Sequence, residues 1–429
     1  MNSEEIISLT DEIKRNSSAT AKMAAKIERL VREVPPPPIP EPPEPPEPPG
    51  VLARAVLIGN PGWQQYPGKE AKYCHARSTH DLKVYQAGGT WRCLVGYGDW
   101  VDNIAGKTGK PITVWSFARM GGAEFEFRPE TTIGEESAWV FVEGDDGTIY
   151  MPGIDPVGDR QGAVYINSNG VWTERETVED AVHLNSLALR NGDIYLLADY
   201  SKSTRPQFQI VKSSDEGRSW VRVKLDADDA VVPRYLVTAG DYVLIFGRQD
   251  GIQGIHALDA QDGFSTLSVD PFPTLPATRN AVSRRAIAYG PLGVLYVSRG
   301  GFDSRARKLL YFDLRDGARM VADFTDRDEY VQDIVVRGET AYVLTAVKGN
   351  REPPFTARVY AACTAATTGG YSPDSWRKVA DVAGFPAGPS SLEVMEGKIF
   401  VGVSNGRRGI PGKRPDAAYA ASGNIYMLA

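Results

Sequence analysis

The chain has 429 residues, of which 42% are hydrophobic and 24% are charged, a balance typical of a globular protein with a sizeable core. Its formal net charge of −6 argues against a nucleic-acid binder, which would carry an excess of Lys and Arg. Three cysteines in so long a chain argue against a disulfide framework, and no apolar run reaches the ~20 residues of a membrane span.

The N-terminal segment predicts a coiled coil. A heptad pattern runs through residues 1–34, with a and d positions at Ile6, Leu9, Ile13, Asn16, Thr20, Met23, Ile27, Leu30 and Val34. A helix with one apolar seam cannot bury that seam alone, so we expect the segment to oligomerise. Small or uncharged e positions favour a homotrimer, and the alternative is a single helix that docks on another protein. The acidic start MNSEEIISLTDE predicts no secretory signal and therefore synthesis in a reducing cytoplasm.

A proline-rich spacer follows the heptads. Residues 35–49 read PPPPIPEPPEPPEPP, and a segment of this composition adopts an extended polyproline II conformation. At ~3.1 Å per residue the spacer reaches roughly 45 Å. We therefore predict three regions: a stalk at 1–34, a linker at 35–50, and a head at 51–429.

The head is predicted to be an all-β propeller. From about residue 135 the sequence repeats a unit of four short strands, with hairpin dipeptides such as Asn169-Gly170 and Asp316-Gly317. The last unit lacks one strand, which residues 51–59 would supply by pairing beside 423–429. Residues 68–128 contain enough strands for a further blade, so seven blades are predicted, with six as the second choice.

One hairpin carries a recognisable motif. Its residues Ser213, Asp215, Gly217 and Trp220 fit the pattern S-x-D-x-G-x-[ST]-W, which resembles the Asp-box of sialidase-like propellers. In that family the box is structural, since Asp closes the turn and Trp packs against the sheet. The sialidase Phe-Arg-Ile-Pro motif has its nearest match at 127–130, which lacks the Ile, and no arginine triad can be assigned. Enzymatic activity is therefore the less favoured interpretation.

No metal or cofactor is predicted. Cys74, His75, His80 and Cys93 have the residue types of zinc ligands, but their spacing fits no zinc pattern. The acidic runs at 226–229 and 326–329 lack the glycine-spaced ligands of a calcium loop.

Loops that join the second and third strands of the units carry an excess of positive charge. The candidate ligand-binding arginines in them are Arg205, Arg299, Arg305, Arg307, Arg351, Arg407, Arg408 and Arg414, and Arg160 and Arg248 lie in equivalent loops. Arginine suits forked binding of carboxylate or phosphate, so these loops predict a ligand face. The alternative is that they pair with the acidic runs at 226–229 and 326–329.

The order of stalk, spacer and β head resembles bacteriophage virion appendages such as tail fibres, spikes and decoration proteins. That resemblance implies a non-enzymatic attachment or decoration protein, assembled in the host cytoplasm and located in the virion. Its partners would be its own copies, other virion structural proteins and bacterial surface polysaccharide, without nucleic acid or membrane insertion. The alternatives are a sialidase-like glycoside hydrolase or polysaccharide depolymerase, and a cytoplasmic scaffolding propeller.

Overall fold

The computed structural model divides the chain into two compact units, Met1–Pro48 and Pro49–Ala429. The described residues all belong to the second unit and are 51–65, 78–98, 111–121, 124–158, 161–177, 179–200, 208–225, 231–249, 252–269, 286–290, 292–299, 306–347, 354–363, 376–404 and 420–429. The predicted stalk and proline-rich linker lie outside these residues. Within the described ranges, no helix is long and apolar enough to cross a membrane.

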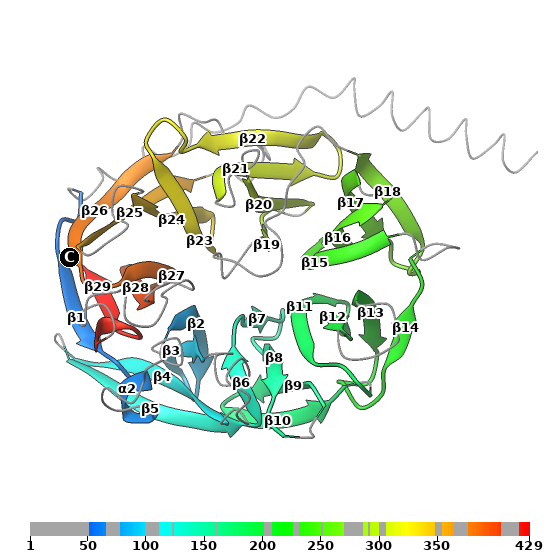
Figure 1. The fold of residues 1–429 in the computed structure, drawn as a ribbon, viewed down its shortest axis with the longest axis horizontal. Coiled ribbons are helices and arrows are strands. Elements are labelled where there is room, and N and C mark those ends of the chain that lie inside the picture. Colours follow the sequence, from blue (N-terminus) through cyan, green and yellow to red (C-terminus); the bar gives the residue numbers. More distant parts are fainter. Residues whose placement is uncertain are drawn as a thin grey trace, which may run out of the picture. The chain divides into compact units, whose positions relative to one another are not determined.

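The second unit is all-β, as predicted, and its antiparallel sheets stand in a propeller-like ring (Figure 1). Five sheets have four strands and one has nine. The described helix is the single turn α2 (Gly62–Gln65).

Within each four-stranded sheet the strands follow one another from the centre of the ring outward, and the start of the unit supplies the outermost strand of the last sheet (Figure 1). The first sheet contains β2 (Thr79–Ala87), β3 (Thr90–Tyr97), β4 (Ile112–Gly121) and β5 (Glu124–Ile133). The nine-stranded sheet contains β6 (Glu135–Ala138), β7 (Val142–Glu143), β8 (Ile149–Pro156), β9 (Ala163–Ser168), β10 (Val171–Glu176), β11 (His183–Arg190), β12 (Asp193–Asp199), β13 (Phe208–Ser213) and β14 (Val221–Val223).

The remaining four sheets complete the ring. Three of them contain β15 (Val231–Ala239), β16 (Tyr242–Gln249), β17 (Ile252–Leu258) and β18 (Phe264–Val269); β19 (Ala286–Ala288), β20 (Gly293–Arg299), β21 (Ala306–Asp313) and β22 (Gly317–Asp323); and β23 (Glu329–Arg337), β24 (Thr340–Val347), β25 (Phe355–Cys363) and β26 (Arg377–Phe385). The last contains β27 (Gly388–Met395), β28 (Lys398–Ser404), β29 (Ile425–Leu428) and β1 (Ala55–Gly59).

This last sheet draws on both ends of the unit. Strand β1 pairs antiparallel with β29, with Ala55 opposite Leu428 and Val56 opposite Met427. This is the pairing expected of residues 51–59 and 423–429. It joins the two ends of the unit within one sheet, so β29 is not left as an open sheet edge.

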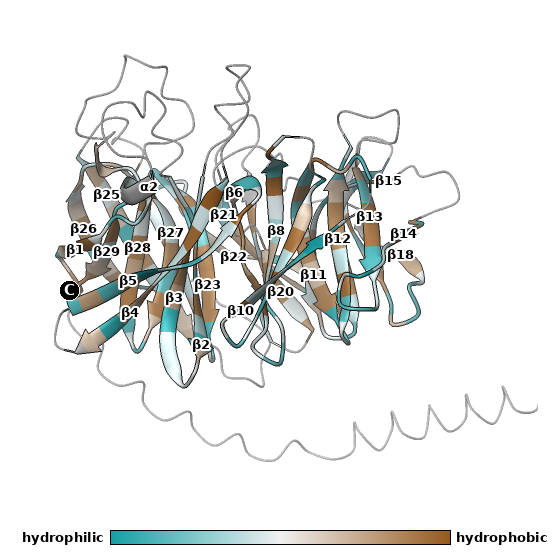
Figure 2. Cartoon of the chain, turned by 90° about the horizontal axis from the view of Figure 1, so that it is seen from below, coloured by the Kyte–Doolittle hydropathy of each residue, from teal (hydrophilic) through white to brown (hydrophobic). Residues whose placement is uncertain are grey.

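The core lies between neighbouring sheets rather than inside any one of them. Tyr195 and Leu197 on β12 pack with Leu236 on β15 and with Val243 and Ile245 on β16. Because each sheet in the ring is covered on both faces, its middle strands read as continuous apolar runs, as in YVLIFG of β16. Figure 2 shows these apolar stretches along the strands.

Inner strands are joined to the next sheet by side chains that bond to its backbone. Three of these bonds run from Phe141 N to Asp81 Oδ2 at 2.7 Å, from Leu236 N to Ser186 Oγ at 3.0 Å, and from Leu392 N to Asp333 Oδ2 at 2.8 Å. Each acceptor directly follows a register shift in its strand. A β-bulge re-aims the side chain, and here it turns a polar group toward the neighbouring sheet. The acceptor residues are almost completely buried.

A second link joins β11 to the sheet that begins with β15. The buried Arg190 donates from Nη1 to Leu258 O at 3.1 Å and from Nη2 to Asp262 Oδ1 at 2.6 Å. Lys212 donates to the other oxygen of Asp262 at 2.8 Å. The cations and the carboxylate therefore satisfy one another, which is the condition under which buried charge is tolerated.

Candidate functional site

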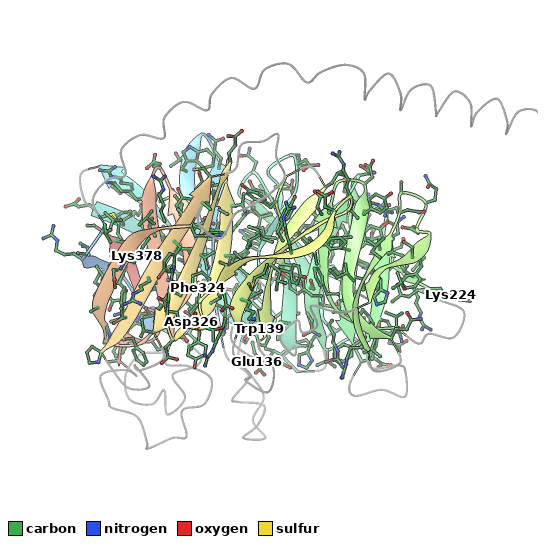
Figure 3. All side chains as sticks on the ribbon, turned by 90° about the horizontal axis from the view of Figure 1, so that it is seen from above. Glu136, Trp139, Lys224, Phe324, Asp326 and Lys378 are labelled. Carbon is green, nitrogen blue, oxygen red and sulfur yellow. The ribbon has the colours of Figure 1, made fainter. Side chains whose placement is uncertain are left out.

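Five ionisable side chains and one aromatic ring lie near the ends of β8, β12 and β16 and the starts of β11, β13 and β15. We call these six residues the rim site: Asp155 on β8, His183 on β11, Asp199 on β12, Phe208 on β13, Arg234 on β15 and Arg248 on β16. The strand register sets their positions, because His183 lies opposite Asp199 and Asp199 lies opposite Phe208. Glu136, labelled in Figure 3, lies on β6, whose residues 135–138 pair with the end of β8 that carries Asp155.

His183 is held between two carboxylates. Its Nε2 donates to Asp155 Oδ1 at 2.7 Å and its Nδ1 to Asp199 Oδ2 at 3.1 Å. Burial disfavours the charged imidazolium, but the hydrogen bonds and charges of the two carboxylates outweigh it and raise the pKa of His183 to about 9. Asp155 adopts a left-handed φ of 59°, a conformation that Asp tolerates better than most residues. His183 is therefore a fixed positive charge at neutral pH and a poor general base.

Glu135, which begins β6, lies close enough to Asp155 and His183 to feel their charges. Its Oε1 accepts a hydrogen bond from Ala163 N at 3.0 Å, and the side chain is almost fully buried. Burial raises the pKa of Glu135 well above its ordinary value, and the charge of Asp155 raises it further. Burial therefore disfavours a negative charge on Glu135.

Arg234 and Arg248 give the other half of the rim site its positive charge. The Arg234 guanidinium carbon lies 4.5 Å from the centroid of the Phe208 ring, a cation–π contact. Burial lowers the pKa of Arg234, and the nearby charge of Arg248 lowers it further, with Asp199 acting in the opposite sense. Among the described residues, no hydrogen bond or ion pair joins either guanidinium to a carboxylate.

The arginines predicted to form the ligand face are described only in part. Arg205, Arg305, Arg351, Arg407, Arg408 and Arg414 lie outside the described residues, as does Arg160. Arg299 is the last residue of β20, and Arg307 and Arg248 lie within strands, so placing these three in loops was wrong. Arg307 donates to Tyr330 Oη at 2.9 Å and lies over its ring, so it contributes to packing inside the head.

The hairpin at 213–220 has the local bonds of a closed turn. Asp215 accepts from Ser219 N at 2.9 Å and from Ser219 Oγ at 2.6 Å, and these bonds, with one from Ser213, lower the pKa of Asp215 to about 2. Gly217 N donates to Ser213 Oγ at 2.8 Å, and Gly217 takes a φ of 81°. Trp220 Nε1 donates to Glu176 O on the neighbouring β10 at 3.2 Å. These contacts give the four residues a structural role.

The segment that most resembles the sialidase Phe-Arg-Ile-Pro motif, residues 127–130, lies on the outer strand of its sheet. Arg128 is on β5, the outermost strand (Figure 1), and its Nε donates to Glu130 Oε1 at 2.8 Å. Burial opposes ionisation of Glu130, but hydrogen bonds from Arg128, Ser116 and Tyr85 outweigh it and lower its pKa. Arg128 is thus engaged in a local pair.

The residues with zinc-ligand types are not grouped in the described part of the chain. His80 Nε2 donates to Gly98 O at 2.7 Å, and the buried Cys93 Sγ donates to Leu94 O at 3.6 Å. Cys74 and His75 lie outside the described residues. Across the described ranges, no group of three or more His, Cys, Asp or Glu side chains is placed to hold a metal ion.

Sequence reasoning found Arg248 but missed Asp155, His183, Asp199 and Arg234. A weak signal was available, because both aspartates come at the ends of apolar second strands, in YMPGID and YLLAD. Which residues face these aspartates depends on how neighbouring strand groups pack together. No fixed spacing along the sequence reveals that packing.

Comparison with known proteins gives no family. No family model and no curated protein matches this chain. Among solved structures, a chain from the crystal structure of a nidogen/laminin complex aligns with 65% of this chain and 97% of its own length. The identity is 11% and the TM-score 0.38, too distant for an argument about function.

Proposed function

We propose that this chain is a non-enzymatic attachment or decoration protein of a bacteriophage virion. Residues 1–34 anchor the protein and join three copies, the proline-rich linker spaces the head, and the head binds a host-surface glycan or another virion protein. The partners are other virion structural proteins and bacterial surface polysaccharide. Assembly takes place in the host cytoplasm.

Within this proposal the head is a seven-bladed propeller. The nine-stranded sheet supports that number, because its two halves are joined between β8 and β11 by one residue pair, His183 opposite Ile154. Counting each half as one blade gives seven with the five four-stranded sheets. The Asp-box interpretation of 213–220 belongs to the same proposal and rests on the turn bonds of Asp215.

The observation that carries the binding role is the positive half of the rim site. Arg234 and Arg248 lie on adjacent strands of one sheet, with the Arg234 guanidinium over the Phe208 ring, and neither has a bonded carboxylate among the described residues. Guanidinium groups in this state bind carboxylates and phosphates. Binding residues are concentrated at the edges of rigid scaffolds, where loops join the strands.

Hydrolysis is the competing function, and two features weigh against it. His183 is held as an imidazolium by Asp155 and Asp199, so it lacks the free nitrogen that a general base needs. Arg128 is paired with Glu130 on an outer strand. A glycosidase nevertheless needs only two carboxyl groups at a suitable separation, so the experiment must measure turnover directly.

A glycan array followed by a reducing-end assay tests the proposal. The full chain should bind acidic bacterial polysaccharide and release no new reducing ends over hours. Release with multiple turnovers would make the chain a hydrolase, and binding to no envelope glycan and no virion protein would refute the attachment role.

A further inference from the structure

One side of the rim site carries positive charge that the carboxylates on its other side do not bind. Asp155 and Asp199 together face His183, and both accept hydrogen bonds from its ring. Arg234 lies on β15 and Arg248 on β16, and among the described residues no hydrogen bond or ion pair joins either of them to a carboxylate.

The carboxylate that acts on Arg234 is already engaged elsewhere. Asp199 favours the charged form of Arg234, but its Oδ2 accepts a hydrogen bond from His183. The positive charges of Arg234 and Arg248 on adjacent strands repel each other, and an anion bound to both reduces that repulsion.

Of the two arginines, Arg234 is held in place and Arg248 is accessible. Arg234 is half-buried and lies over the Phe208 ring at 4.5 Å, which limits the positions of its guanidinium. Arg248 is exposed at the end of β16, with Val232 of β15 opposite it in the register. One fixed and one accessible guanidinium on adjacent strands form a site that an anion can enter from solvent without rearranging the sheet.

We propose that Arg234 and Arg248, beside the Phe208 ring, bind an oxyanion carried by a glycan. This inference rests on the proposed binding function and names its ligand chemistry. Two groups of surface polymers carry such an oxyanion: the carboxylate of an acidic sugar and the phosphodiester of a polyol-phosphate chain.

Calorimetric titration of the full chain with three probes tests the assignment. The probes are an oligogalacturonate, a glycerol-phosphate oligomer and neutral dextran. The wild-type chain should bind one or both anionic probes and not dextran, and the probe it binds identifies the source of the oxyanion. Arg248→Ser should weaken that binding about tenfold or more, since a charge-assisted hydrogen bond is lost. Arg248→Lys should restore part of it, because charge returns without the planar fork.

Arg218→Gln is the matched control, because Arg218 is an exposed arginine on the 213–220 hairpin that pairs with Glu216. It should leave binding unchanged, and both Arg248 variants should unfold at the wild-type temperature. Equal binding of the anionic probes by wild type and Arg248→Ser, or no binding of either by wild type, would overturn the assignment. Binding of host envelope glycan that is indifferent to Arg248 would sink this inference and leave the proposed function standing. If the wild-type chain binds no envelope glycan and no virion protein, the proposed function itself is refuted.

Discussion

Replacing His183 with Gln should remove a stabilisation that depends on pH. An unfolded histidine has a pKa near 6.5, whereas Asp155 and Asp199 raise the pKa of folded His183 to about 9. The folded state therefore binds the proton more tightly. Its contribution is fully present below pH 6.5 and is lost as pH rises through 9. At 1.36 kcal/mol per pKa unit this linkage is worth about 3 kcal/mol.

Denaturant unfolding of wild type and His183→Gln at pH 6 and pH 9.5 measures this contribution. The difference in free energy of unfolding between the two proteins should be larger at pH 6, by about 3 kcal/mol. Comparing the two proteins at each pH cancels the titration of Glu135 and other shared groups to first order.

An NMR titration of the imidazole signals gives an independent reading. The chain has four histidines, so the signal lost in His183→Gln is assigned directly. It should titrate near pH 9 in wild type and at lower pH in Asp155→Asn, which removes the negative charge from the acceptor of the shorter of its two hydrogen bonds. Titration near pH 6.5, or the same stability difference at both pH values, would refute the interpretation of His183 as an imidazolium held by Asp155 and Asp199.

Three further predictions concern the ring. Arg190→Ala should lower the free energy of unfolding by about 2 kcal/mol in denaturant titration, because it removes the buried hydrogen bond to Leu258 O and the ion pair with Asp262, which keeps Lys212 as a partner; a loss below 1 kcal/mol would contradict this. Gly98→Ala should destabilise strongly, since its Cβ would lie 2.1 Å from Glu136 O, whereas Gly88→Ala meets open space and should cost about 1 kcal/mol for its positive φ alone. Equal melting temperatures for the two alanine variants would count against the packing described. Deleting 423–429 should open the ring and markedly lower the unfolding temperature, and an unchanged melting curve would rule out closure by β1 and β29.

The repeat and its strands could be predicted from sequence because their signals are local. An apolar run, a turn dipeptide such as Asn169-Gly170 and the next apolar run lie within one hairpin, and both turn residues take the positive φ expected. The missing strand of the last sheet could be inferred by counting. Each of these inferences needs only residues that are neighbours in sequence, or a count of the strands in each repeat.

The rim site could not be predicted in the same way. His183 meets Asp155 across the junction of two strand groups, and Arg234 reaches Phe208 across another. A one-residue change in register moves a side chain to the opposite face of its strand, and several inner strands contain such shifts. Charge counting along loops pointed to Arg248, which lies near the end of β16, and to Arg307, which lies within β21 and donates to Tyr330.

Immunogold electron microscopy of purified particles tests the central claim most directly. Under the proposed function, antibody raised against residues 51–429 should label bacteriophage particles, with three heads at each attachment point and a gap between head and particle from the proline-rich linker. Particles that carry none of the protein, while infected-cell cytoplasm contains it, would contradict the account.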